Sequence, residues 1–286
     1  MAGRWQVAMW TALGAVLGGA GDGALPARGA APEKPKTLVL EGSTTVGPIA
    51  DAFAEAFKKM YPGVNITVNK TGSGDGAAAL QDGRCDIADM SRFMKEKEFK
   101  GCVEKGVMPV AHVIAMDGVC VILHPSNPIK ALTTAQIRDI YTGKTTNWKQ
   151  LGGPDARIVP ITRDSSSGTF ETFETLVMAR QKMAGHVETV NSNPAAKARV
   201  ASTSGAVAYV GLGFVDNTAH AVTVDGVAPN RKTIASGTYP IARPLFMFTN
   251  GYPKLGSIVH AFVTFYLTEK GQEIIEAKGF IPLTSY

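Results

Sequence analysis

Short apolar runs alternate along the chain with helical patterns. Residues 37–40 form an apolar run, and residues 64–68 alternate between polar and apolar side chains, as a half-buried strand does. Between these two runs, the large apolar residues have helical spacing and share one face: Ile49, Phe53, Phe57 and Met60. The order strand, helix, strand, helix predicts an α/β fold with a parallel sheet and helical crossovers.

The same pattern continues to the C-terminus. It predicts further strands over residues 107–115, 119–123 and 158–161, a buried strand or close-packed turn over residues 205–211, and helices over residues 132–141, 170–177, 257–267 and 271–277. We expect residues 239–248 to carry the chain back to the first domain. Asp117 and Gly118 separate two of these strands and predict a turn, because both residue types are common in turns. We interpret this strand, turn, strand passage as a crossover between two domains.

Three of the predicted helices follow a turn rich in glycine and hydroxyl side chains. The turns span residues 41–48, 71–76 and 163–169. A helix N-terminus carries free backbone N–H groups and a partial positive charge, which favour an anion. The hydroxyls add donors, the glycines allow close approach, and Arg163 adds a charged fork. Each turn alone is typical of an ordinary helix cap, but if the fold brings the three together, they would surround a small anion with donors.

Composition sets broad limits on the fold and on the partners. The 286 residues, with 45% hydrophobic content, suffice for one large or two medium domains. The net charge of +5 is mild, and the lysines are scattered without interleaved aromatic residues. This distribution argues against nucleic-acid binding.

The N-terminus has the pattern of a signal peptide over residues 1–30. Arg4 precedes an apolar stretch over residues 7–20, and small residues follow over residues 24–31. We therefore expect export, with cleavage near residues 27–31 and a periplasmic or otherwise extracytoplasmic location. The alternative is a leader that stays on the chain.

Three cysteines allow one disulfide in an exported protein. Cys85 and Cys102 flank a charged segment, whereas Cys120 lies within a run that predicts a buried strand. We expect Cys85 and Cys102 to pair. The alternative is three reduced and buried thiols.

The sequence contains no clear catalytic or metal-binding motif. The five histidines are scattered without metal-ligand spacing, and no Gly-x-Ser-x-Gly elbow occurs. A serine among residues 165–167 has no base close in sequence. Gly143 and Lys144 resemble the end of a P-loop, but Arg138 stands where that motif needs glycine. We therefore expect no enzyme activity, no metal and no cofactor.

These segments together resemble the PstS family, the phosphate-binding component of ABC-type phosphate importers. The resemblance rests on residues 42–46, 72–76, 86–92, 140–148 and 163–169. It implies a type II periplasmic-binding-protein fold with two α/β lobes, each a mixed and mostly parallel sheet flanked by helices. Lobe I would comprise residues 36–117 and 245–286 and lobe II residues 118–244, with crossovers near residues 116–119 and 241–246.

The resemblance also implies a monomeric receptor that captures inorganic phosphate and delivers it to the membrane subunits of a permease. Thr44 and Thr45 would donate hydroxyl and backbone N–H groups, and Ser73 would donate its hydroxyl. Arg163 would pair with phosphate oxygens. The other residues carried over from the family are Ser91, Arg92, Ser167, Gly168 and Thr169.

The sequence departs from part of the family at Ser91, where some members have an aspartate that accepts the proton of hydrogen phosphate. Asp75 or Asp89 could take that role, or serve as a cap or a surface charge. Arg92 has two readings, a phosphate contact or a link between the lobes through a carboxylate. The alternatives to a phosphate receptor are a secreted phosphohydrolase and a receptor for another oxyanion such as sulfate or molybdate.

Overall fold

The computed structural model describes residues 37–283, so the expected signal peptide and its cleavage region lie outside the described residues. Within that range, no helix is both long enough and apolar enough to cross a membrane. The strands are β1 (Thr37–Gly42), β2 (Asn65–Lys70), β3 (Ile87–Met90), β4 (Pro109–Leu123), β5 (Ala131–Leu132), β6 (Val159–Arg163), β7 (Glu188–Val190), β8 (Ala206–Gly211), β9 (His220–Ala221), β10 (Thr223–Val224) and β11 (Ala242–Asn250). The helices are α1 (Gly47–Met60), α2 (Ser73–Gln81), α3 (Glu96–Glu104), α4 (Thr134–Thr142), α5 (Gly168–Leu176), α6 (Asn193–Ala201), α7 (Arg231–Ala235), α8 (Ile258–Val263) and α9 (Glu269–Ala277), with 3-10 turns η1 (Trp148–Leu151), η2 (Leu212–Phe214) and η3 (Phe265–Leu267).

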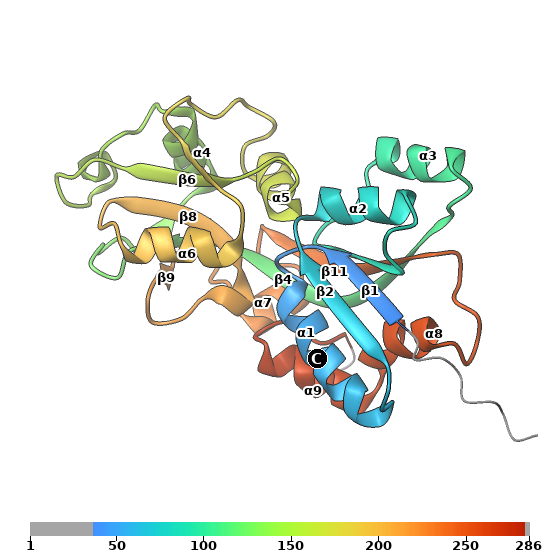
Figure 1. The fold of residues 1–286 in the computed structure, drawn as a ribbon. Coiled ribbons are helices and arrows are strands. Elements are labelled where there is room, and N and C mark those ends of the chain that lie inside the picture. Colours follow the sequence, from blue (N-terminus) through green and yellow to red (C-terminus); the bar gives the residue numbers. More distant parts are fainter. Residues whose placement is uncertain (1–36, 284–286) are drawn as a thin grey trace, which may run out of the picture. The chain divides into compact units, whose positions relative to one another are not determined.

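One mixed sheet carries most of the strands of the described chain (Figure 1). Its order is β2-β1-β3-β11-β4-β8-β6-β7, and β9 also pairs with β4. Strand β1 lies parallel to β2 and β3, and β6 lies parallel to β7 and β8. The long strands β11 and β4 run antiparallel to their neighbours and join the two parallel groups. The α/β fold with parallel strands and helical crossovers is therefore confirmed.

Strand β4 continues through the position where the sequence predicted a turn. It pairs with β11 up to Gly118 and with β8 from Val119 onward. Asp117 is fully buried and accepts a hydrogen bond from the backbone N–H of Leu212, so its polarity does not mark a solvent-exposed turn. A Cβ at Gly118 would lie 2.5 Å from Ile234 Cδ1, so this glycine permits close packing. The predicted turn at residues 117–118 is wrong for these two reasons.

The buried apolar residues fall into two groups on either side of this change of partner. The first core draws its buried members from residues 38–115 and 245–280. The second core draws its members from residues 119–241 together with Ile281. In the second core the rings of Phe173 and Tyr209 stack with centroids 3.9 Å apart. Helix α5 is thereby fixed against β8.

Several predicted helix boundaries agree with the structure. The hydroxyl of Thr133 caps α4 by accepting a hydrogen bond from the N–H of Gln136. Gly143 ends that helix in the left-handed conformation, with φ of 82°, as a C-terminal glycine should. Ser167 caps α5 by accepting from the N–H of Phe170 at 3.2 Å. The glycine-hydroxyl turn therefore leads directly into a helix, as the sequence indicated.

The disulfide predicted between Cys85 and Cys102 is wrong. Cys85, Cys102 and Cys120 are all free thiols and all buried. Cys85 and Cys102 belong to one apolar cluster of the first core, together with Met90 and Val107. Burial raises the pKa of the Cys85 thiol to about 12. These cysteines pack as small apolar side chains, which was the alternative left open by the sequence.

Candidate functional site

The three glycine-hydroxyl turns meet at one place in the structure. They follow β1, β2 and β6 and lead into α1, α2 and α5 (Figure 1). The hydroxyls of Thr45 and Thr169 lie 3.0 Å apart, and the N–H of Gly74 donates to the carbonyl of Ser166 at 2.9 Å. The fold therefore brings the three turns together, which is the condition on which the predicted anion site depends.

The first turn presents its hydroxyls through a tight backbone arrangement. Gly42 has φ of 138°, and a Cβ there would lie 2.2 Å from the carbonyl oxygen of Asp89, so both the backbone conformation and the packing require glycine. The hydroxyl of Ser43 accepts hydrogen bonds from the N–H groups of Thr45 and Val46. This serine holds the turn, and the side chains of Thr44 and Thr45 are left buried at the point where the turns meet.

Gly168 lies directly against two serines that come from the first core's side. A Cβ at this position would lie 2.5 Å from Ser73 Oγ and 2.6 Å from Ser91 Oγ. The two hydroxyls are 3.3 Å apart, and the N–H of Ser91 donates to Ser73 Oγ at 3.0 Å. Only a glycine allows α5 to begin this close to β3 and α2.

Arg163 ends β6 and is buried with part of its guanidinium group unpaired. Its Nη2 donates to Thr44 Oγ1 at 3.2 Å and to the carbonyl of Asn191 at 3.0 Å. Nε and Nη1 have no hydrogen-bond partner among the described residues. Burial lowers the pKa of Arg163 to about 10, so the group remains a cation at neutral pH. Two buried charged donors without a partner indicate a place for an anion.

Asn193 is a member of this cluster that the sequence reasoning missed. Its Nδ2 donates to Thr44 Oγ1 at 3.1 Å and to Thr45 Oγ1 at 2.9 Å, while its Oδ1 accepts from the N–H of Gly211. Asn193 follows β7, with Ser192 as the cap of α6. This is a fourth strand-to-helix junction with polar side chains, and its cap and proline could have identified it.

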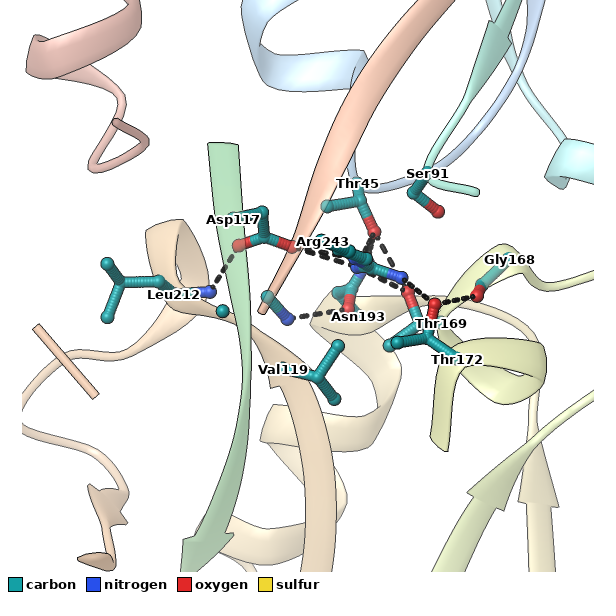
Figure 2. A network of polar contacts seen from close by, with 12 residues as sticks. Thr45, Ser91, Asp117, Val119, Gly168, Thr169, Thr172, Asn193, Leu212 and Arg243 are labelled. Carbon is teal, nitrogen blue, oxygen red and sulfur yellow. Dashed lines mark hydrogen bonds and ion pairs between the residues drawn. The ribbon is translucent and has the colours of Figure 1, made fainter. Parts of the chain in front are cut away.

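A buried ion pair lies beside the threonines. Arg243 Nη2 is 2.9 Å from Asp117 Oδ2, and both side chains are almost inaccessible. The same nitrogen donates to Thr169 Oγ1 at 3.0 Å and to Thr45 Oγ1 at 3.4 Å (Figure 2). The sequence reasoning missed this pair because its members come from two distant strands with no motif around either residue.

Arg92 lies between carboxylates. Its Nη1 and Nη2 bond both carboxylate oxygens of Glu98, and its Nε lies 2.7 Å from Glu171 Oε2. Glu171 also lies 2.8 Å from Lys95 Nζ. Arg92 therefore has carboxylate partners on two helices, Glu98 on α3 and Glu171 on α5.

The two candidate acceptors differ in burial. Asp75 is exposed, and Asp89 is almost fully buried with Oδ1 unpaired among the described side chains. Burial, with a smaller contribution from Asp51, raises the pKa of Asp89 well above its ordinary value. In the described range, neither carboxylate is hydrogen-bonded to a hydroxyl of the three turns.

Known proteins with the same sequence pattern identify the family. Residues 29–270 match the model of a PBP superfamily domain. The phosphate-binding protein PstS of Bacillus subtilis is 32% identical over 250 residues, which cover 87% of this chain and 81% of that protein. The chain belongs to the PstS family.

Two solved structures of phosphate receptors resemble this PstS-family chain. A Clostridium perfringens substrate-binding protein of a phosphate ABC transporter, solved with bound phosphate, is 34% identical with a TM-score of 0.80. The similarity covers 87% of this chain and all of that one. An ABC-type phosphate transport receptor from Vibrio cholerae is 32% identical with a TM-score of 0.70 and covers 85% of this chain and 99% of its own. These matches support the type II periplasmic-binding-protein fold.

Proposed function

We propose that this PstS-family protein captures inorganic phosphate at the junction of α1, α2 and α5 and delivers it to an ABC-type permease. The observation that carries the proposal is the buried guanidinium of Arg163, whose Nε and Nη1 have no hydrogen-bond partner in the described chain. A buried charged group without a partner is costly, and a bound oxyanion supplies the missing acceptors. The matching relatives are named as phosphate-binding proteins, which agrees with this ligand.

The proposed ligand set follows the residues that surround this guanidinium. Thr44, Thr45, Ser73, Ser91, Arg163, Ser167, Gly168 and Thr169 donate hydroxyl, backbone N–H or guanidinium groups to the anion. The charge is then met mainly by dipolar groups at helix N-termini and by one cation. We assign Arg92 a different task, because its charge is already met by Glu98 and Glu171. It holds the two sides of the site together.

The protein works as two lobes that close on the ligand. Lobe I corresponds to residues 36–117 and 245–286, and lobe II to residues 118–244. The division of the buried apolar residues into a first and a second core supports this assignment. Closure creates a surface from both lobes that a permease can recognise.

A receptor that delivers phosphate to an importer has to be located outside the cytoplasm. We propose that residues 1–30 direct export and that the mature chain acts as a monomer in the periplasm or an equivalent compartment. The basic start and apolar stretch of the N-terminus support the first point.

Titration calorimetry of the mature, phosphate-stripped protein tests the proposal. We expect one phosphate per chain, with no turnover of an aryl phosphate. No binding after stripping would contradict the receptor function. Steady phosphate release that disappears in Ser167→Ala would instead support the phosphohydrolase alternative. Competition by sulfate and by molybdate distinguishes a phosphate receptor from a receptor for another oxyanion.

A further inference from the structure

Thr44 can act only as a donor toward a ligand. A hydroxyl has one hydrogen to donate and two lone pairs to accept with. Both lone pairs of Thr44 Oγ1 are occupied, one by Arg163 Nη2 at 3.2 Å and one by Asn193 Nδ2 at 3.1 Å. The hydrogen of this hydroxyl is therefore left for an acceptor outside the network.

The same count applies to the neighbouring pair of threonines (Figure 2). Asn193 Nδ2 donates to Thr45 Oγ1 at 2.9 Å. The two hydrogens of Arg243 Nη2 go to its two nearest acceptors, Asp117 Oδ2 and Thr169 Oγ1. Either threonine can then be the donor in the 3.0 Å contact between their hydroxyls. The hydroxyl that accepts in this contact has both lone pairs occupied, since Thr45 also accepts from Asn193 and Thr169 also accepts from Arg243. Its own hydrogen is also left to be donated onward.

The orientation of Asn193 determines this polarity. The side chain is fully buried, and its Oδ1 accepts from the backbone N–H of Gly211 at 3.2 Å. A reversed amide would point an NH₂ group at that N–H and a carbonyl oxygen at the threonines. The NH₂ group therefore faces Thr44 and Thr45, and both hydroxyls receive a hydrogen bond from it.

The serine side of the site differs from this threonine side. Ser73 Oγ accepts from one backbone N–H and shares one contact with Ser91 Oγ, so the pair keeps unused lone pairs. Ser167 Oγ accepts only from the N–H of Phe170. A protonated ligand oxygen therefore finds its acceptors on the serine side.

We propose that Asn193 is a positioning residue that sets the specificity of the site. It fixes the threonine side as donors, so this side accepts only unprotonated ligand oxygens. The single proton of the phosphate dianion then lies toward Ser73 and Ser91. This inference rests on the proposed phosphate-binding function. It specifies a tetrahedral dianion as the ligand and assigns its proton to one side of the site.

The variant Asn193→Asp tests the inference because it has nearly the same shape and the opposite polarity. Its carboxylate accepts from the hydroxyls of Thr44 and Thr45, so these two hydrogens are no longer available to the ligand or to Thr169. We expect phosphate affinity to fall by at least about tenfold, the equivalent of one lost charge-assisted hydrogen bond. In this variant the threonine hydroxyls can accept the proton of hydrogen phosphate, which offsets part of the loss. Sulfate carries no proton, so its affinity should fall further than that of phosphate.

The ratio of the two affinities separates this effect from simple charge repulsion, which weakens both dianions alike. A second readout is the pH profile of phosphate binding. In the unmodified protein we expect affinity to rise from about pH 6 to about pH 8, as phosphate loses its second proton. In Asn193→Asp this rise should flatten, since the threonines can then accept a proton.

Asn127→Asp is the matched control, because Asn127 is another almost fully buried asparagine and lies outside the site. It should leave the affinity ratio and the pH profile unchanged. Asn193→Ala covers the case in which Asn193→Asp does not fold, and it should shift the ratio in the same direction. An unchanged ratio and profile in both Asn193 variants would overturn the inference. Failure of the unmodified protein to bind phosphate would instead contradict the proposed function.

Discussion

Arg92 Nε lies 2.7 Å from Glu171 Oε2, and this ion pair joins the end of β3 to helix α5. Arg92 belongs to the side of the first core, and Glu171 stands on a helix that packs on the second core. Arg92 also bonds Glu98, which lies on α3 on its own side. One guanidinium group therefore has a carboxylate partner on each side of the site.

Glu171→Gln should weaken phosphate binding by a few-fold and less than about tenfold, in keeping with a partly exposed ion pair worth up to about 1 kcal/mol. The variant removes a link that favours the closed arrangement, while every proposed ligand group stays in place. Calorimetry at low and high salt measures the effect, which should shrink with salt. Glu98→Gln is the control and should change affinity less. A larger loss of phosphate affinity in Glu98→Gln than in Glu171→Gln would contradict a link through Glu171.

Arg163→Met should reduce phosphate affinity by about 10²-fold or more, because two charge-assisted hydrogen bonds to the anion are lost. The ligand-free chain should keep its melting temperature or gain slightly, since a buried and partly unpaired charge is removed. Thermal unfolding with and without phosphate measures both effects. Arg163→Lys keeps the charge but not the forked guanidinium, so its phosphate affinity should lie between those of Arg163→Met and the unmodified protein. If phosphate raised the melting temperature of Arg163→Met as much as that of the unmodified protein, Arg163 would not be part of the phosphate site.

Arg243→Met should destabilise the protein by about 3–5 kcal/mol, because it leaves the buried carboxylate of Asp117 without its partner. The double variant Asp117→Asn with Arg243→Met should recover part of this loss. Chemical denaturation of the single and double variants gives the coupling between the two side chains. Additive losses would show that the pair is not coupled.

The titration of Asp89 should make the stability of the folded protein depend on pH. Burial raises its folded-state pKa, so its contribution is complete below the ordinary carboxyl pKa and declines as pH rises toward the folded-state pKa. Within that window the free energy of unfolding should fall by about 1.4 kcal/mol per pH unit. Asp89→Asn removes this decline and should be more stable than the unmodified protein at neutral pH. The exposed Asp75→Asn serves as the control, and an unchanged slope in Asp89→Asn would exclude Asp89 as its cause.

Thiol reactivity should confirm that no disulfide forms between Cys85 and Cys102. All three cysteines are buried, and burial raises the pKa of Cys85 to about 12, so the folded protein should react slowly with a thiol reagent. The denatured protein, without reductant, should react at all three positions. A single reactive thiol after denaturation would show that a disulfide is present.

The local part of the site could be predicted from the sequence. A run such as residues 163–169 contains its cap, its glycine and its hydroxyls within one turn, so the helix start follows from neighbouring residues alone. The same holds for Thr133 and Gly143 at the two ends of α4. These features depend on hydrogen bonds between residues that are close in sequence, so they can be predicted from the local sequence.

Other contacts depend on strand order and could not be predicted. Asp117 meets Arg243 because β4 and β11 are neighbours, and no residue near either one indicates that pairing. The sequence around Asp117 therefore predicts a turn instead of a continuous strand. The cysteine pairing failed for a related reason, since spacing along the chain does not say whether two thiols lie in an apolar cluster. Asn193 could be predicted only in part. Its place at a capped helix start follows from the local sequence, but its contact with Thr44 does not.

The unbroken course of β4 bears on how the protein can move. The strand is hydrogen-bonded to β11 up to Gly118 and to β8 from Val119, so no unpaired residue separates the two sections. If the two cores move as the proposed lobes, the motion has to be taken up as twisting of this paired strand, spread over many peptide units. Such a joint would resist sideways slippage between the two cores.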